Sequence, residues 1–360
     1  MSAARRHLAA IAALPRPAGG DAERAARAYC AGVLRDAGFA MSEHPFEYST
    51  FPGRWGTPLG GVVLAAMFAG AGQLGLRGNA RASLLVLAFG AALLCGLAFW
   101  LGRWGVLDVR FARARGVNLA ATRGRPTLWL VAHLDSKSQP VPIGVRAAGI
   151  IASIAIWVLA LLLAIAQLLG GVPRWLWIPA SVLGVLAAIP VITSTVGARS
   201  PGALDDASGV VTVLRAAELL PREMPMGVLL TSAEELGLAG ARAWARDAAP
   251  SRAMNVDGVD DAGAIRVTFT GRSPRALAAV LARGGDAWPR MRRLPPGALM
   301  DGVALADAGW DVVNVSKGGW RTVSRIHTSR DDLARLEGGG AEEVAAMLAR
   351  AIAFESESAF

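Results

Sequence analysis

Cysteine, tyrosine and lysine are all scarce in this 360-residue sequence, which has two cysteines and two tyrosines. Cys95 lies inside a long apolar run, where a disulfide bond to Cys30 is implausible, so a disulfide framework is excluded. Lys137 and Lys317 are the only lysines, and arginine therefore supplies almost all of the formal net charge of +9. The basic residues are scattered and form no stripe interleaved with aromatic residues, so we expect no nucleic-acid partner. The net positive charge favours contact with anionic lipid headgroups.

Acidic, basic and histidine residues are absent from four long apolar runs, at about 58–76, 83–101, 147–169 and 175–196. At about 1.5 Å per residue, a helix of roughly 20 residues spans a hydrocarbon core of about 30 Å. Buried core helices of a soluble protein are the alternative, but uncharged runs of this length are rare in such cores. We therefore expect four transmembrane helices and a lipid bilayer as a partner.

The four runs pair into two hairpins, at 57–101 and 143–197, so that 1–56, 102–142 and 198–360 lie on one side of the membrane. More arginines flank the runs on this side than on the side of the connecting turns. By the positive-inside rule, we expect an integral protein of the inner membrane whose globular part is cytoplasmic. The arginines on the domain side are Arg54, Arg103, Arg110, Arg113, Arg115, Arg146 and Arg199, and those at the turns are Arg77, Arg81 and Arg174.

A transporter or channel is a second interpretation of four membrane spans. Transport pathways usually need ionisable groups inside the membrane. These runs contain the amides of Gln73 and Gln167 but no acidic, basic or histidine residue. Anchoring is the simpler role.

Outside the runs, the pattern of apolar residues predicts alternating strands and helices. A helix is expected over 22–38 and a strand over Phe46–Phe51, and the segment after the second hairpin alternates strands with helices at about 238–248, 274–284 and 341–354. Such alternation predicts an α/β fold, with a mixed, largely parallel sheet flanked by helices and interrupted by the two hairpins. Sites in such folds collect at the carboxyl ends of the strands.

Histidines and acids follow several of the predicted strands. His133 follows the apolar stretch 128–132, and Asp135 lies two positions after it. If His133 binds a metal through one ring nitrogen, the carboxylate of Asp135 can hold the other. This spacing also occurs by chance. Asp205 and Asp206 stand in a Gly/Pro turn before a helix, where a carboxylate can bridge two cations; capping of the helix would explain one of the two acids.

Glu234 and Glu235 are adjacent acids at a strand end, and their mutual repulsion calls for a positive partner. A metal ion with its water would relieve it, with one carboxylate as ligand and the other handling the proton; the alternative is a helix start enriched in glutamate. A fourth strand ends in Asp257, and His327 stands in a loop rich in acids. His7 and His44 lack such surroundings, and we expect both at the surface.

Taken together, five residues form a candidate ligand set, with Glu234 left over as a base: His133, Asp205, Glu235, Asp257 and His327. Nitrogen and oxygen ligands without thiolate suit catalytic zinc, and five ligands with one bridging carboxylate fit two zinc ions about 3.5 to 4 Å apart.

The order His-x-Asp, Asp-Asp-Ala-Ser-Gly, Glu-Glu-x-Gly-Leu, Asn-x-Asp, Ile-His-Thr-x-x-Asp resembles the co-catalytic zinc aminopeptidase family (peptidase family M28, clan MH), which also contains glutamate carboxypeptidase and glutaminyl cyclase. The resemblance covers 116–136 and 200–354 well, and 1–56 loosely. It implies a zinc exopeptidase-like fold and a zinc-dependent aminopeptidase acting on peptides with a free N-terminus.

For the site, the resemblance implies that His133 and Asp257 hold one zinc, that Glu235 and His327 hold the other, and that Asp205 bridges them through a segment with a cis Asp205-Asp206 peptide. Glu234 would be the general base and then protonate the leaving amine, and Asp135 would orient His133. Cyclases of the family keep a single zinc, so the intact ligand set favours hydrolysis.

Several matters stay open at this point. A catalytically silent membrane scaffold of the same fold, a glutaminyl cyclase and a carboxypeptidase-type specificity are the alternatives. Gly302 follows Asp301 where the family often has an aromatic residue or histidine, and its role is unassigned. The preferred side chain, the physiological substrate, the metal's identity and the oligomeric state are not encoded in recognisable motifs, because the pocket-lining residues are expected in the unaligned stretch near 285–300.

Overall fold

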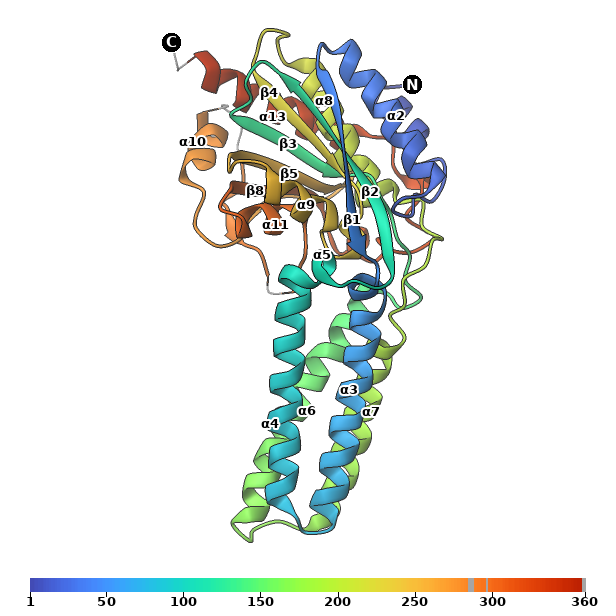
Figure 1. The fold of residues 1–360 in the computed structure, drawn as a ribbon, viewed down its shortest axis with the longest axis vertical. Helices are drawn as coiled ribbons and strands as arrows, with labels where there is room; N and C mark the ends of the chain where they lie inside the picture. Colours follow the sequence, from blue (N-terminus) through green and yellow to red (C-terminus); the bar gives the residue numbers. More distant parts are fainter. Residues whose placement is uncertain (284–287, 296, 358–360) are drawn as a thin grey trace. The chain divides into compact units, whose positions relative to one another are not determined.

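The computed structural model describes residues 1–283, 288–295 and 297–357 (Figure 1). The chain divides into two units. The sheet unit consists of Met1–Thr50, Leu107–Ser138 and Ala198–Phe360, and the helical unit consists of Phe51–Val106 and Gln139–Gly197.

An eight-stranded mixed sheet forms the centre of the sheet unit, with the strand order β1-β2-β4-β3-β5-β8-β6-β7. The central strands β4, β3, β5 and β8 are parallel. The pairs β1–β2, β2–β4 and β6–β8 are antiparallel, and β7 pairs with β6 in the parallel sense. This arrangement confirms the predicted α/β fold. The strands are β1 Ala40–Ser49, β2 Arg113–Arg123, β3 Leu128–His133, β4 Met226–Thr231, β5 Arg252–Val259, β6 Ala264–Phe269, β7 Arg292–Arg293 and β8 Asp311–Gly318.

Helices cover both faces of the sheet. Successive strand residues point to opposite faces, so Leu130 of β3 packs into the larger of two apolar cores and Val131 into the smaller one. The larger core is closed by α1 Ala3–Ile11, α2 Asp21–Asp36, α8 Ser208–Leu219, α10 Arg275–Arg283 and α13 Gly339–Glu357, and the smaller one by α9 Ala239–Asp247 and α11 Asp301–Asp307. The buried strands in the middle of the sheet are therefore largely apolar, and their polar residues of interest lie at the carboxyl ends of the strands.

That edge collects the ends of three neighbouring parallel strands. His133 is the last residue of β3, and the short η4 Glu234–Leu236 follows β4 directly. Asp257 lies in β5 where the register with β8 becomes irregular, between Val256 and Val259, so this strand continues two residues beyond the acid that the sequence places at its end. The topology thus brings residues 72 to more than 120 positions apart to one place.

The helical unit contains four long helices, each long and apolar enough to cross a membrane. They are Phe51–Leu76 (α3), Ala80–Asp108 (α4 Ala80–Trp100 with the helical turns that continue it), Ile143–Leu168 (α6) and Arg174–Ile192 (a helical turn followed by α7 Trp177–Ile192). Phe51 was expected in a strand, but it begins α3. Pro52 follows it, and proline is favoured in the first turn of a helix because its missing N–H needs no partner there.

Helices α3 and α7 pack closely through glycine. A Cβ added at Gly72 would lie 1.7 Å from the hydroxyl of Ser181, and one added at Gly184 would lie 2.4 Å from the ring of Phe68. Such close approach of helix backbones is typical of helices that pack in lipid, where dispersion contacts rather than the hydrophobic effect hold helices together.

The amide of Gln167 joins three of these helices. It donates to the carbonyl of Gly75 in α3 at 2.9 Å and accepts from the indole of Trp177 in α7 at 2.7 Å. One of the two amides found in the apolar runs therefore has a structural role in the bundle.

Candidate metal centre

His133 occupies the end of β3 with both ring nitrogens engaged. Its Nδ1 lies 3.1 Å from the main-chain oxygen of Asp135, and its Nε2 lies 3.0 Å from Oδ1 of Asp205. The side chain is 2% exposed. An imidazole that donates from Nδ1 to a carbonyl presents Nε2 as a free ligand nitrogen, so the ring is oriented for a metal on the Asp205 side.

Asp205 lies between the two histidines. Its Oδ1 faces Nε2 of His133, and its Oδ2 lies 3.0 Å from Nε2 of His327. One carboxylate thus reaches both imidazoles, although Asp205 lies 72 positions after His133 and 122 positions before His327 in the chain. The Asp205-Asp206 peptide bond is cis, as the family resemblance implies.

Two further acids fix the turn that carries Asp205. Asp331 accepts hydrogen bonds from the amides of Leu204 and Asp205 at 2.6 and 3.2 Å. The carboxylate of Asp206 accepts from the amides of His133, Gly209 and Gly258. Asp206 is therefore the structural member of the adjacent pair, and Asp205 is left to face the histidines.

Asp135 acts on the turn that carries the glutamates. Its two carboxylate oxygens accept hydrogen bonds from the amides of Glu234 and Glu235, at 3.0 and 3.1 Å. The carboxylate lies 3.7 Å from Nδ1 of His133, so the ring is oriented mainly by the main-chain oxygen of the same residue. Asp135 thereby couples the placement of His133 to that of both glutamates.

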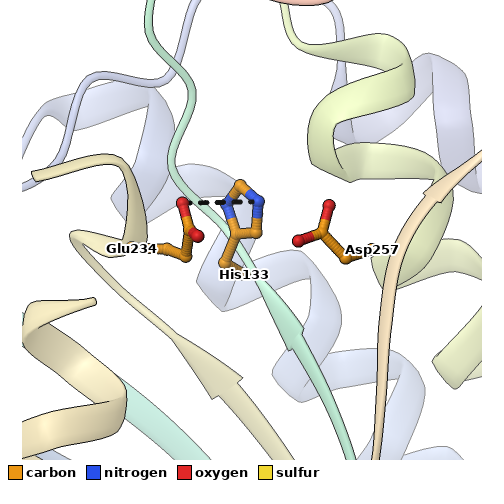
Figure 2. Close-up of side chains that lie close together, drawn as sticks. All are labelled: His133, Glu234 and Asp257. Atoms are coloured by element: carbon orange, nitrogen blue, oxygen red, sulfur yellow. Dashed lines mark ion pairs between the residues drawn. The ribbon is translucent and has the colours of Figure 1, made fainter. Parts of the chain in front are cut away.

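Two groups of potential metal ligands result. In the first, His133, Glu234 and Asp257 offer ligand atoms that all lie within 4.8 Å of one another, and Figure 2 shows the two carboxylates on either side of the imidazole. In the second, Asp205, Glu235 and His327 do the same. Glu235 Oε1 lies 3.2 Å from Nε2 of His327. All six candidate residues of the sequence therefore meet at one edge of the sheet.

Comparison with known proteins bears on this cluster. Residues 189–352 match the model of peptidase family M28. This segment of the chain is therefore similar to the peptidases of family M28. The match contains four of the five candidate ligands and Glu234, while His133 lies before it. No curated protein matches the sequence.

Solved structures of similar fold include an aminopeptidase from Aneurinibacillus sp. strain AM-1, at 14% identity and a TM-score of 0.55, covering 97% of this chain and 92% of that one. They also include the zinc aminopeptidase BSAP from Bacillus subtilis, at 14% identity and a TM-score of 0.54, covering 98% and 94%. A glutaminyl cyclase from Fimbriiglobus ruber matches at 13% identity with a TM-score of 0.54, covering 98% and 94%. At these identities the likeness shows the fold alone.

The cluster of His133, Asp205, Glu234, Glu235, Asp257 and His327 holds more negative than positive charge. Burial and, after it, the nearby charge of Asp205 raise the pKa of Asp257 to about 7. Burial likewise raises the pKa of Glu234 well above its ordinary range, against the lowering effect of His133. Burial alone would lower the pKa of His133, but Glu234 and the aspartates raise it well above its ordinary value. A divalent cation would relieve this excess charge, so the residues fit a metal.

Lys137 is a member of the site that the sequence did not single out. Its Nζ lies 2.5 Å from Oε2 of Glu235, and its side chain is 17% exposed. Burial alone would lower the pKa of Lys137, but Glu235 and Glu234 raise it above its ordinary value. Its position two residues after Asp135, in a chain with two lysines, was the only signal available.

Arg16 is a second buried cation that sequence reasoning missed. It is 0% exposed, and its guanidinium donates to the main-chain oxygens of Leu134, Pro201 and Gly202. These carbonyls belong to the loops that follow His133 and precede Asp205. Arg16 therefore ties the N-terminal segment to the two loops that position the centre.

Asp301 and Gly302, whose role the sequence left open, lie at the start of α11. Asp301 is 1% exposed and is hydrogen-bonded to the hydroxyl of Thr231, and burial raises its pKa to about 6. A Cβ on residue 302 would lie 2.0 Å from the side-chain oxygen of Asn314, so the glycine admits the close approach of α11 to β8. Asn314 is itself buried and hydrogen-bonded to Asn255.

The two remaining histidines differ from each other. His44 is exposed, as expected. The prediction of a surface position for His7 was wrong: it is 7% exposed, with Nδ1 2.8 Å from the Tyr29 hydroxyl and Nε2 3.4 Å from the Glu218 carboxylate. It is covered because α1 packs on the sheet unit. Of the expected pocket stretch near 285–300, residues 285–287 and 296 lie outside the described part of the chain.

Glu23 is a buried acid in α2, and its ionisation provides a pH-dependent prediction. It is 1% exposed and accepts a hydrogen bond from the amide of Gly19 at 2.6 Å. Burial and, after it, the charge of Asp135 raise its pKa from 4.5 to about 7. With a raised folded-state pKa, the stability contributed by the protonated form is present below about pH 4.5 and is lost as the pH rises through about 7.

Glu23→Gln is therefore expected to raise the free energy of unfolding at pH 8 by up to about 3 kcal/mol, with the gain shrinking toward zero at about pH 5. Urea unfolding of the detergent-solubilised protein at both pH values measures this difference. Glu223→Gln, at an exposed position, is the matched control. If the Glu23→Gln protein is no more stable than the wild type at pH 8, the pKa of the Glu23 carboxyl is not raised in the folded state.

Proposed function

We propose that the chain is a membrane-anchored zinc aminopeptidase that hydrolyses peptides from a free N-terminus with a pair of zinc ions. The observation that carries this proposal is the single carboxylate of Asp205, which reaches His133 with one oxygen and His327 with the other. A bridging carboxylate between two imidazoles is what two adjacent metal ions require.

We assign His133 and Asp257 to one zinc, Glu235 and His327 to the other, and Asp205 to both. The donor set is nitrogen and oxygen only, which suits catalytic zinc. Within the described residues, Glu235 Oε1 is buried without a hydrogen-bond partner, and a cation in the second group would satisfy it. The B. subtilis protein of similar fold is a zinc aminopeptidase, which supports the same metal here.

When bound, the zinc pair supplies an activated water and polarisation of the scissile carbonyl. Glu234 is the group placed to move the proton. Its Oε2 lies 3.9 Å from Nε2 of His133, and the whole carboxylate is buried, which favours taking up a proton from the attacking water and returning it to the leaving amine. Asp135 holds Glu234 in place through the main chain, because it fixes the amides of both glutamates.

The four long apolar helices support membrane anchoring. We propose hairpins at 57–101 and 143–197 in the inner membrane, with the peptidase domain built from 1–56, 102–142 and 198–360 in the cytoplasm. The greater number of arginines next to the domain-side ends of the hairpins supports this orientation.

A panel of peptide substrates tests the proposal. We expect the purified, zinc-loaded protein to hydrolyse aminoacyl-anilides and short peptides with a free N-terminus, and to leave N-acetylated versions intact. Cyclisation of N-terminal glutaminyl peptides without hydrolysis would indicate a glutaminyl cyclase instead. Hydrolysis from the C-terminal end of blocked peptides would indicate a carboxypeptidase-type specificity.

A further inference from the structure

One positively charged side chain competes with the proposed second metal for its ligand. Lys137 Nζ lies 2.5 Å from Oε2 of Glu235 and 3.5 Å from the main-chain oxygen of the same residue. The other carboxylate oxygen, Oε1, faces His327. The two oxygens of this carboxylate are thus divided between an ammonium group and the second metal position.

The first metal position has no such cation. His133 is flanked there by Glu234 and Asp257, and no lysine or arginine among the described residues is paired with either carboxylate. In the proposed assignment the two metal positions are otherwise alike, because each has one imidazole and one carboxylate of its own and shares Asp205. Lys137 is the feature that makes the two positions unequal.

Two consequences follow from electrostatics. An ammonium group a few Å from a divalent cation in a buried site repels it strongly, since protein screens charges less than water does. A carboxylate that already bonds a cation through one oxygen also offers a metal only its other oxygen. Both effects lower the affinity of the second position.

Resting on the proposed two-zinc function, we propose that Lys137 shares Glu235 with the second zinc, weakens its binding and so makes the two ions load in sequence, His133 site first. Lys137 is a positioning residue for Glu235 and sets the free zinc level at which the centre is complete. The enzyme would therefore respond to zinc supply through its second site.

Zinc binding at controlled free zinc tests this inference independently of activity. The full chain in detergent is stripped of metal, equilibrated with zinc in chelator buffers of graded strength, and its bound zinc is counted by elemental analysis. We expect two equivalents of zinc per chain at saturation. As free zinc is lowered, the zinc at the Glu235 and His327 position should leave before the one at His133. In Lys137→Met the free zinc needed to half-fill the second site should fall at least about tenfold, while the first site is unchanged.

Lys137→Arg is the matched control, because it keeps the positive charge, and it should load like the wild type. Unchanged or weaker binding of the second zinc in Lys137→Met, with two equivalents still bound at saturation, would overturn the role of Lys137 and leave the two-zinc function standing. Fewer than two equivalents at saturation in every protein would overturn both. Thermal unfolding of the metal-free variants verifies that each is folded.

Discussion

Glu234→Gln is expected to lower kcat/KM for an aminoacyl-anilide by about a hundred- to ten-thousandfold, the usual contribution of a general acid–base group. Glutamine keeps the size of the side chain but cannot accept the proton of the attacking water. The pKa of Glu234 is raised by burial, which brings the carboxyl closer to the range useful for proton transfer at neutral pH. Zinc content should stay at the wild-type level, because Glu234 is assigned as the base rather than a ligand.

Steady-state kinetics and elemental analysis of the same preparation check both parts. Glu337→Gln, at an exposed position, should leave activity and zinc unchanged and serves as the control. Unaltered kcat/KM in Glu234→Gln would remove the proposed base. Absence of peptidase activity in the wild type as well would favour the silent-scaffold alternative.

Asp205→Asn is expected to have the broadest effect on the metal centre. The amide offers one oxygen in place of the two that face His133 and His327, so neither metal position keeps its shared ligand. Bound zinc should fall from two equivalents to less than about one, and activity to background. Elemental analysis after dialysis at fixed free zinc measures the loss.

Asp257→Asn provides the matched comparison, because this carboxylate is assigned to only one of the two zinc ions, whereas Asp205 is assigned to both. It should lose the zinc at His133 and retain the one at His327. Retention of two equivalents in Asp205→Asn, or equal losses in both variants, would contradict a bridging role for Asp205.

The sequence predicts the fold because the central strands and the long helices each have a distinct pattern of apolar residues. Uninterrupted apolar strands such as Leu128–His133 and Met226–Thr231 predict central parallel strands, and long uncharged runs predict the long helices of the helical unit. Strand ends predict where acids and histidines collect, since parallel strands present their carboxyl ends at one edge. The local order of motifs therefore carries most of the architecture.

Contacts made between distant segments were not predictable in this way. Lys137 and Glu235 are 98 residues apart, and Arg16 contacts the loops at 134 and 202 across still longer separations, so no periodicity links them. His7 was misplaced for the same reason, because its burial depends on packing against Tyr29 and Glu218. Asp135 was recognised as an orienting residue, but its contact with two amides required the fold.

Anomalous diffraction at the zinc edge, from crystals grown at saturating zinc, tests most directly whether Asp205 lies between two metal ions. We predict two peaks about 3.5 to 4 Å apart, one beside His133 and one beside His327, with the Asp205 carboxylate between them. A single peak, or peaks away from these three side chains, would contradict the two-zinc centre.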